Sequence, residues 1–191
     1  SPRADVAAAV ERAREAQRIW GELSVHERSR YLRRWGDLLW RERDEIMRVI
    51  REETGKSEGS AMAEIILADS TLTYYVHHGE KLLAPQNRPP VLPLVERGRL
   101  YYKPHGVAGF ISPWNYPFLL SVADMIPALI AGNTAIVKPS DLTPLSALYA
   151  AGMFERVGLP PNVMQVITGD GDTGAALVDF VDYISFTGST A

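Results

Sequence analysis

A single amide, Asn115, lies in a turn of prolines and aromatic residues, Pro-Trp-Asn-Tyr-Pro at positions 113–117. The turn follows an apolar run that predicts a strand over residues 106–111. A side-chain amide held between an indole and two prolines offers a fixed N–H donor, the kind of group that stabilises an oxyanion. Open α/β folds place such chemistry at the carboxyl ends of their strands. The alternative is a turn asparagine that bonds to nearby backbone groups.

A second candidate site follows another apolar run, where Lys138 precedes Asp141 by three residues. A lysine and an acid so placed can hold the hydroxyl groups of one ribose between them. The alternative is a strand-end lysine that only reaches into water.

The glycine-rich loop at positions 169–174, Gly-Asp-Gly-Asp-Thr-Gly, fits the G-x-G-x-x-G dinucleotide-binding pattern. That pattern requires an acidic residue about 20 positions further on, at the end of the next strand. The next predicted strand, residues 183–187, instead ends in Thr-Gly. Two aspartates inside the loop would also repel a pyrophosphate. These residues therefore argue against the standard Rossmann mode of binding.

A better anion site follows at positions 186–190, Phe-Thr-Gly-Ser-Thr. Gly188 permits close approach of the backbone, and hydroxyl groups lie at the predicted start of a helix. The alternative is an ordinary Ser/Thr helix cap. The adjacent pair His77 and His78 does not predict a metal site, because neighbouring histidines on a helix point in different directions and no partner lies four residues away.

The elements that must position these residues alternate from His105 onward. We predict strands at 106–111, 134–138, 163–168 and 183–187, separated by helices at 117–131, 143–157 and 171–179. Short connections between alternating strands and helices predict an α/β fold with a parallel sheet.

The first part of the chain predicts amphipathic helices. Asp5 is a candidate N-cap, Ser24 and Glu27 fit a capping box, and Gly55 suits a C-cap, while a fourth helix runs from about Ser60 to Gly79. Further on, the pattern predicts a β-hairpin in which 94–95 and 99–103 flank a turn at 96–98, with glycine supplying a positive φ.

Composition excludes several other classes of protein. The 191 residues are 46% hydrophobic and carry a net charge of −3, so no basic footprint for nucleic acid is present. The longest apolar stretch is broken by Pro127, Gly132 and Asn133, which predicts no membrane span. The chain has no cysteine, which excludes disulfides and thiolate metal sites but identifies no compartment. It shows no secretion signal, so a cytoplasmic location is the default expectation. Residues 1–58 hold 13 basic and 12 acidic residues whereas 103–191 hold 3 and 7, which places the buried sheet in the second part.

Three motifs in this order, GVAGFISPWNYP at 106–117, AIVKPSD at 135–141 and FTGST at 186–190, resemble the aldehyde dehydrogenase family. The resemblance implies that Asn115 forms part of the oxyanion hole and that Tyr116 and Leu120 line the substrate tunnel. It assigns the adenosine ribose to Lys138 and Asp141, where most family members have Glu at the second position. Asp124 stands where many members have Lys. The cofactor-binding set that it implies is Ile111, Ser112, Pro113, Trp114, Lys138, Ser140, Asp141, Gly171, Phe186, Gly188 and Ser189.

The resemblance also implies a domain organisation. Residues 1–90 would form the helical part of the cofactor-binding domain, 91–103 a hairpin arm that bridges subunits of a homo-oligomer, and 104–191 the first part of a Rossmann-like domain. The family's nucleophilic cysteine and catalytic glutamate lie beyond Ala191, so we expect a fragment that is inactive by itself.

The activity implied for the intact protein is oxidation of an aldehyde to a carboxylic acid with NAD, NADP being possible, in a manner similar to semialdehyde dehydrogenases. Two other functions stay open: a non-catalytic nucleotide-binding or structural homologue, and a dehydrogenase that uses its glycine loop in the standard Rossmann way.

Overall fold

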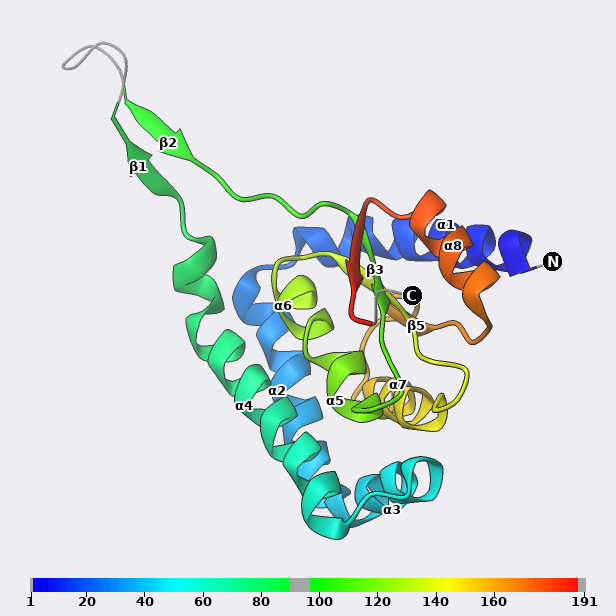
Figure 1. Ribbon diagram of the computed structural model, residues 1–191. Coiled ribbons are helices and arrows are strands. Elements are labelled where there is room, and N and C mark those ends of the chain that lie inside the picture. The colour runs from blue at the N-terminus through cyan, green and yellow to red at the C-terminus, as the bar shows by residue number, and fades with distance from the viewer. Residues whose placement is uncertain (1, 90–96, 189–191) are drawn as a thin grey trace.

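The computed structural model describes residues 2–89 and 97–188 of the chain. Its first part is helical, and a hairpin then leads to a four-stranded sheet (Figure 1). The N-terminal helices are α1 (Pro2–Glu22), α2 (Val25–Arg41), α3 (Arg43–Thr54) and α4 (Glu58–Leu83). No helix among the described residues is long and apolar enough to cross a membrane.

Local sequence signals set the ends of these helices. The predicted capping box is confirmed, since Ser24 Oγ accepts from the backbone of Glu27 and the Glu27 carboxylate accepts from the backbone of Ser24. Gly55 ends α3 in the left-handed region, with φ of 72°, as predicted. Asp5 is not an N-cap, because α1 already begins at Pro2, whose fixed φ suits a first helical position.

The second part of the chain folds into a parallel sheet with the strand order β5-β4-β3-β6. The predicted alternation of strands and helices is confirmed. Its elements are β3 (Val107–Ile111), α5 (Pro117–Val122), α6 (Met125–Ile130), β4 (Thr134–Lys138), α7 (Leu145–Arg156), β5 (Met164–Val166), α8 (Gly171–Phe180) and β6 (Tyr183–Phe186). The chain steps outward from β3 to β5 and then returns to place β6 on the other side of β3. The topological switch point therefore lies between β3 and β6.

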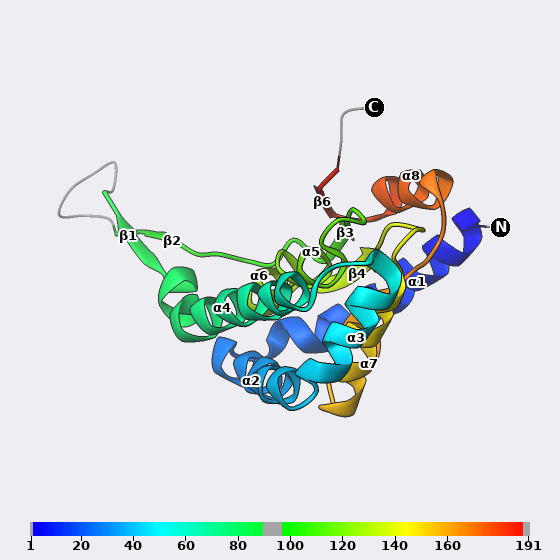
Figure 2. The ribbon, with the colours of Figure 1, turned by 60° about the horizontal axis from the view of Figure 1, so that its bottom comes forward.

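Helices cover both faces of the sheet (Figures 1 and 2). On one face, the Trp35 ring of α2 stacks against Phe118 at 6.2 Å and against Phe154 at 4.9 Å between ring centroids. On the other face, α1 and α8 pack side by side and bury Val10 and Leu177. Successive residues of β3 and β4 alternate between the two cores, as expected for a sheet buried on both faces.

The N-terminal helix α1 is tied to the last elements of the chain. Arg3 forms an ion pair with Asp179 at 2.6 Å, and Arg14 forms one with Asp182 at 2.9 Å. Gln165 also donates to the carbonyl oxygen of Ala9 at 2.9 Å. The first helix is therefore fixed by residues that lie more than 150 positions later.

Two predicted elements differ in the structure. The predicted helix 117–131 is two short helices, α5 and α6, because Pro127 lacks an N–H and its ring would clash with the carbonyl of Ala123 in a continuous helix. The hairpin pairs β1 (Gln86–Arg88) with β2 (Gly98–Leu100), so the turn predicted at 96–98 is wrong.

The role predicted for Gly98 is also wrong, since this residue lies inside β2 and has no positive φ. A Cβ at this position would come within 2.8 Å of the Arg88 carbonyl oxygen, so close approach between the strands requires the glycine. The partner strand predicted at 94–95 lies outside the described residues.

Candidate functional site

The turn that carries Asn115 directly follows β3, where the sheet ends. The Asn115 side chain is exposed and forms no hydrogen bond within residues 2–89 and 97–188. Its neighbours Trp114 and Tyr116 are 58% and 42% exposed. The described contacts therefore do not support the alternative in which the amide satisfies local backbone groups.

The two ends of this turn are nevertheless fixed. Before it, Ser112 N donates to Lys138 O at 3.1 Å, and the buried Ser112 hydroxyl bonds to that of Ser121 at 3.0 Å. A long hydrogen bond of 3.5 Å also joins Thr143 Oγ1 to Trp114 O. The exposed amide of Asn115 is thus held between anchored backbone segments.

After the turn, the buried carboxylate of Glu64 lies at the start of α5. Its Oε2 accepts from the backbone N–H groups of Phe118 and Leu119, both at 3.0 Å. Its Oε1 pairs with Lys56 Nζ at 2.6 Å, and the same ammonium lies 3.8 Å from the centroid of the Tyr116 ring. Sequence reasoning missed this cluster. The available signal was an acidic residue on the apolar stripe of α4, next to Ile65.

The predicted ribose-binding pair lies at the end of the neighbouring strand. Lys138 is buried, and its Nζ donates to Pro139 O at 3.0 Å. Burial lowers the pKa of Lys138, whereas the charges of Asp141 and Asp170 act in the opposite direction. Asp141 is exposed, and its carboxylate accepts from Ser140 Oγ at 3.5 Å. The pair therefore presents an exposed carboxylate beside a buried ammonium.

The glycine-rich loop has a local structural explanation. Asp170 caps α8 by accepting from the backbone of Asp172 at 3.1 Å and Thr173 at 3.3 Å. Gly169 has φ of 152°, and a Cβ there would come within 2.2 Å of Thr173 Oγ1. The anion-binding end of α8 is thus filled by the chain's own carboxylate, which counts against the standard Rossmann reading. Gly171 faces open space, since an added Cβ would meet nothing within 4 Å.

A carboxylate likewise binds the first N–H groups of each helix that comes directly after β3, β4 or β5. Glu64 fills the start of α5 and Asp170 that of α8, while the Glu53 carboxylate accepts from Leu145 and Ser146 at the start of α7. The N–H groups at the starts of all three helices are thus already bonded to carboxylates of the chain itself and are closed to a free anion.

The structure brings the predicted segments to one edge of the sheet. Ile111, the last residue of β3, pairs with Lys138 on one side and with Phe186 on the other. Thr187 N also donates to Ile111 O at 3.0 Å, so the backbone pairing with β3 continues one residue beyond β6, up to the residue before Gly188. Pro113 follows directly in the turn. Ser189, the predicted pyrophosphate contact, lies outside the described residues.

The predicted tunnel residues flank the turn. Tyr116 is the last residue before α5, and its carbonyl accepts from Leu120 N at 2.9 Å. Leu120 is half-buried. Asp124, at the break between α5 and α6, accepts from Ser185 Oγ of β6 at 2.9 Å.

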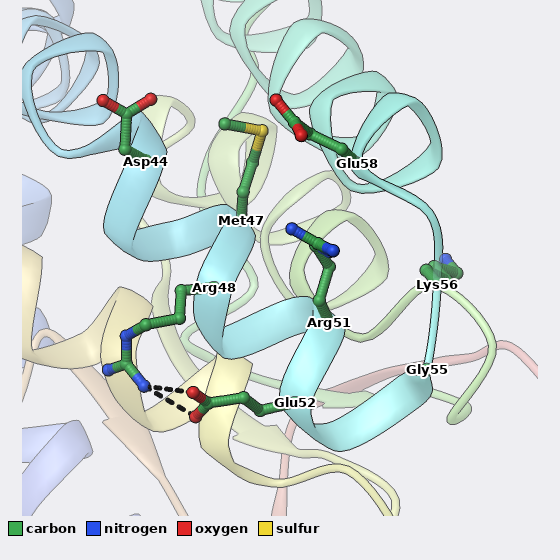
Figure 3. A pocket seen from close by; sticks show the side chains of 8 residues that line it. All are labelled: Asp44, Met47, Arg48, Arg51, Glu52, Gly55, Lys56 and Glu58. Carbon is green, nitrogen blue, oxygen red and sulfur yellow. Dashed lines mark hydrogen bonds and ion pairs between the residues drawn. The ribbon is translucent and has the colours of Figure 1, made fainter.

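A separate open groove of about 640 Å³ lies between α3 and the start of α4 (Figure 3). Its Arg48 is already paired with Glu52 at 2.6 Å, as the dashed lines in Figure 3 show. Of the lining residues, Lys56 connects to the turn through Tyr116. None of the predicted site residues lines this groove, so we do not assign the chemistry to it. No group of three His, Cys, Asp or Glu residues in the described ranges could hold a metal ion.

The fold and the strand order define an open α/β protein whose sheet has its switch point between β3 and β6. The profile of the Aldehyde dehydrogenase family matches residues 1–191. The chain belongs to the aldehyde dehydrogenase family. The resemblance inferred from the three motifs is thereby confirmed.

Relatives of known name cover nearly all of this chain. It is 44% identical over 188 residues to a Mycolicibacterium smegmatis protein named "Putative succinate-semialdehyde dehydrogenase (NADP(+))", and the match covers 98% of this chain and 36% of the relative. The chain thus spans about a third of that relative's length.

Solved structures agree on the fold. The crystal structure of an NAD-dependent benzaldehyde dehydrogenase from Corynebacterium glutamicum is 35% identical with a TM-score of 0.90, over 98% of this chain and 41% of that one. A succinate-semialdehyde dehydrogenase from Burkholderia pseudomallei is 34% identical with a TM-score of 0.92, over 98% of this chain and 39% of that one. The expected fold, the N-terminal part of an aldehyde dehydrogenase, is confirmed.

Proposed function

We propose that the protein containing this chain oxidises an aldehyde to a carboxylic acid, with NAD or NADP as hydride acceptor. The observation that carries the proposal is the Asn115 amide, which is exposed and unbonded within the described residues in a turn anchored on both sides at the carboxyl end of β3. Membership of the aldehyde dehydrogenase family and the names of the relatives support the same reaction.

In this reaction a nucleophile adds to the aldehyde carbon, and the carbonyl oxygen becomes an oxyanion. Asn115 donates a hydrogen bond to that oxygen, and the interaction is strongest after attack because the charge develops there. The nucleophile is a cysteine by family resemblance, and residues 1–191 contain none, so it comes from another part of the protein. Tyr116 and Leu120 would line the path of the aldehyde.

The residues at this edge of the sheet fit a dinucleotide. Lys138 and Asp141 would hold the adenosine ribose, assisted by Ser140, and the open space at Gly171 leaves room for the adenine. The filled starts of α5, α7 and α8 favour a pyrophosphate beyond β6, at Gly188 and Ser189. The nicotinamide, when bound, supplies the hydride acceptor.

The test is a steady-state assay of the full-length protein with succinate semialdehyde and with benzaldehyde, each with NAD and with NADP. We expect formation of reduced cofactor, with succinate semialdehyde as the better substrate, and none when the aldehyde is left out. Cofactor binding without turnover on any pair would contradict the proposal and favour a non-catalytic homologue. The homo-oligomeric state and the cytoplasmic location stay predictions.

A further inference from the structure

Glu64 is fully buried, yet it lies on α4, outside the turn that carries Asn115. Its carboxylate bonds the first free N–H groups of α5, at Phe118 and Leu119. A negative charge at a helix start is stabilising, and two backbone hydrogen bonds fix where the helix begins. Because α5 begins at Pro117, the carboxylate also fixes the downstream end of the Asn115 turn.

Lys56 adds a second restraint from the loop between α3 and α4. Its ammonium neutralises Glu64 at 2.6 Å and lies over the Tyr116 ring at 3.8 Å from the centroid. The Lys56 side chain is 18% exposed and that of Glu64 is 0% exposed, so water screens this pair only weakly. One ion pair thus contacts both the residue after Asn115 and the helix that follows it.

We propose that Glu64, together with Lys56, positions the Asn115 amide for the oxyanion, an inference that rests on the proposed function. Neither side chain touches the reacting atoms, so both are positioning residues. A displacement of about 1 Å of a catalytic group can cost on the order of a hundredfold in rate. Loss of either residue would leave Asn115 present but less well oriented.

The alternative is that Glu64 only stabilises the fold, since any buried carboxylate with three partners would do so. A double-mutant cycle between Glu64 and Asn115 separates the two roles. If Glu64 acts through Asn115, its substitution has no effect on turnover once the amide is gone. A purely stabilising residue would act equally in both backgrounds.

The experiment compares full-length wild type, Glu64→Gln, Asn115→Ala and the double variant, with kcat, the KM of both substrates and the thermal midpoint measured for each. We expect Glu64→Gln to lower kcat about tenfold with cofactor KM little changed. The double variant should match the kcat of Asn115→Ala. Glu42→Gln is the control, because its side-chain partners are Tyr149, at 2.8 Å, and Arg156, neither of which is a predicted site residue. Its kcat should equal that of wild type.

Two outcomes would overturn this inference but leave the proposed function standing. In the first, wild type is active and Glu64→Gln has the same kcat. In the second, the fold-reduction of kcat in the double variant equals the product of the fold-reductions in Glu64→Gln and Asn115→Ala. A wild type that oxidises no aldehyde would instead overturn the proposed function and, with it, this inference. If Glu64→Gln does not fold, Lys56→Met takes its place in the same cycle. A lowered kcat that vanishes in the Asn115→Ala background supports the inference, and an unchanged or multiplying kcat contradicts it.

Discussion

Arg28 donates from Nε to the carbonyl oxygen of Ile130 at 2.9 Å, so a buried guanidinium on α2 closes the carboxyl end of α6. The same side chain donates from Nη1 to the carbonyl oxygens of Trp20, Gly21 and Leu23 at the end of α1. Burial lowers the pKa of Arg28, yet a guanidinium keeps its proton in proteins. One charge therefore joins two helix ends to each other.

We expect Arg28→Met to destabilise the full-length protein by about 3 kcal/mol, because buried carbonyl groups would lose their donor. Thermal unfolding should show a clearly lower midpoint. Arg33→Met is the control, since Arg33 is exposed on the same helix. Equal midpoints for the two variants would contradict the structural role of Arg28.

Asn115→Ala should lower kcat by about 10²–10³, the usual cost of losing an oxyanion donor. The Kd of the cofactor should stay within about twofold, because the amide acts on charge that exists only after attack. Steady-state kinetics and cofactor titration check this, with Asn87→Ala on the exposed strand β1 as control. A variant with normal kcat and a raised cofactor Kd would make Asn115 a structural turn residue.

If the proposed function holds, the intact protein should prefer NAD to NADP because of Asp141. Its exposed carboxylate would face the 2′-phosphate of NADP at close range, and Asp170 adds a second negative charge near Lys138. We expect Asp141→Ser to shift the kcat/KM ratio toward NADP by about tenfold, equivalent to about 1.4 kcal/mol. Asp37→Ser, on the exposed side of α2, should leave the ratio unchanged. A wild type that uses NADP equally well would remove Asp141 from this role.

Residues 1–191 produced alone should not oxidise aldehydes. Without a cysteine there is no thiolate to form the thiohemiacetal from which hydride is transferred. The check is the same assay with several aldehydes and both cofactors, run beside the full-length protein. Turnover clearly above buffer would refute the prediction.

The intact protein should form a homo-oligomer through the hairpin, which projects away from the body in Figures 1 and 2. Both residues Leu100 and Tyr101 are exposed there, at 37% and 58%, and a two-stranded hairpin is marginally stable by itself. Replacing both by Asp should reduce the mass measured by light scattering. Ile19→Asp, at an exposed apolar residue of α1, is the control. An unchanged mass in the hairpin variant would exclude this arm as the contact.

The sheet and the edge that carries the candidate site could be predicted from the sequence, because apolar runs alternate with helical patterns and each run ends in a polar motif. Two of the partners of Glu64 could not, since they are backbone N–H groups 54 and 55 positions away, and a backbone N–H is present whatever the side chain. The pairing of Gly98 with Arg88 was missed for a similar reason: it depends on the close approach of two backbones.

The docking of α1 against α8 has a consequence for synthesis on the ribosome. Arg3 is synthesised 176 positions before its partner Asp179. At about 5–20 residues per second, the ribosome needs roughly 9–35 s to synthesise the intervening residues. During that interval Val6, Val10 and Ala13 have no complete surface on which to pack. Within this chain, α1 is thus made long before the α8 surface that buries its apolar stripe, so that stripe stays uncovered until α8 has been synthesised.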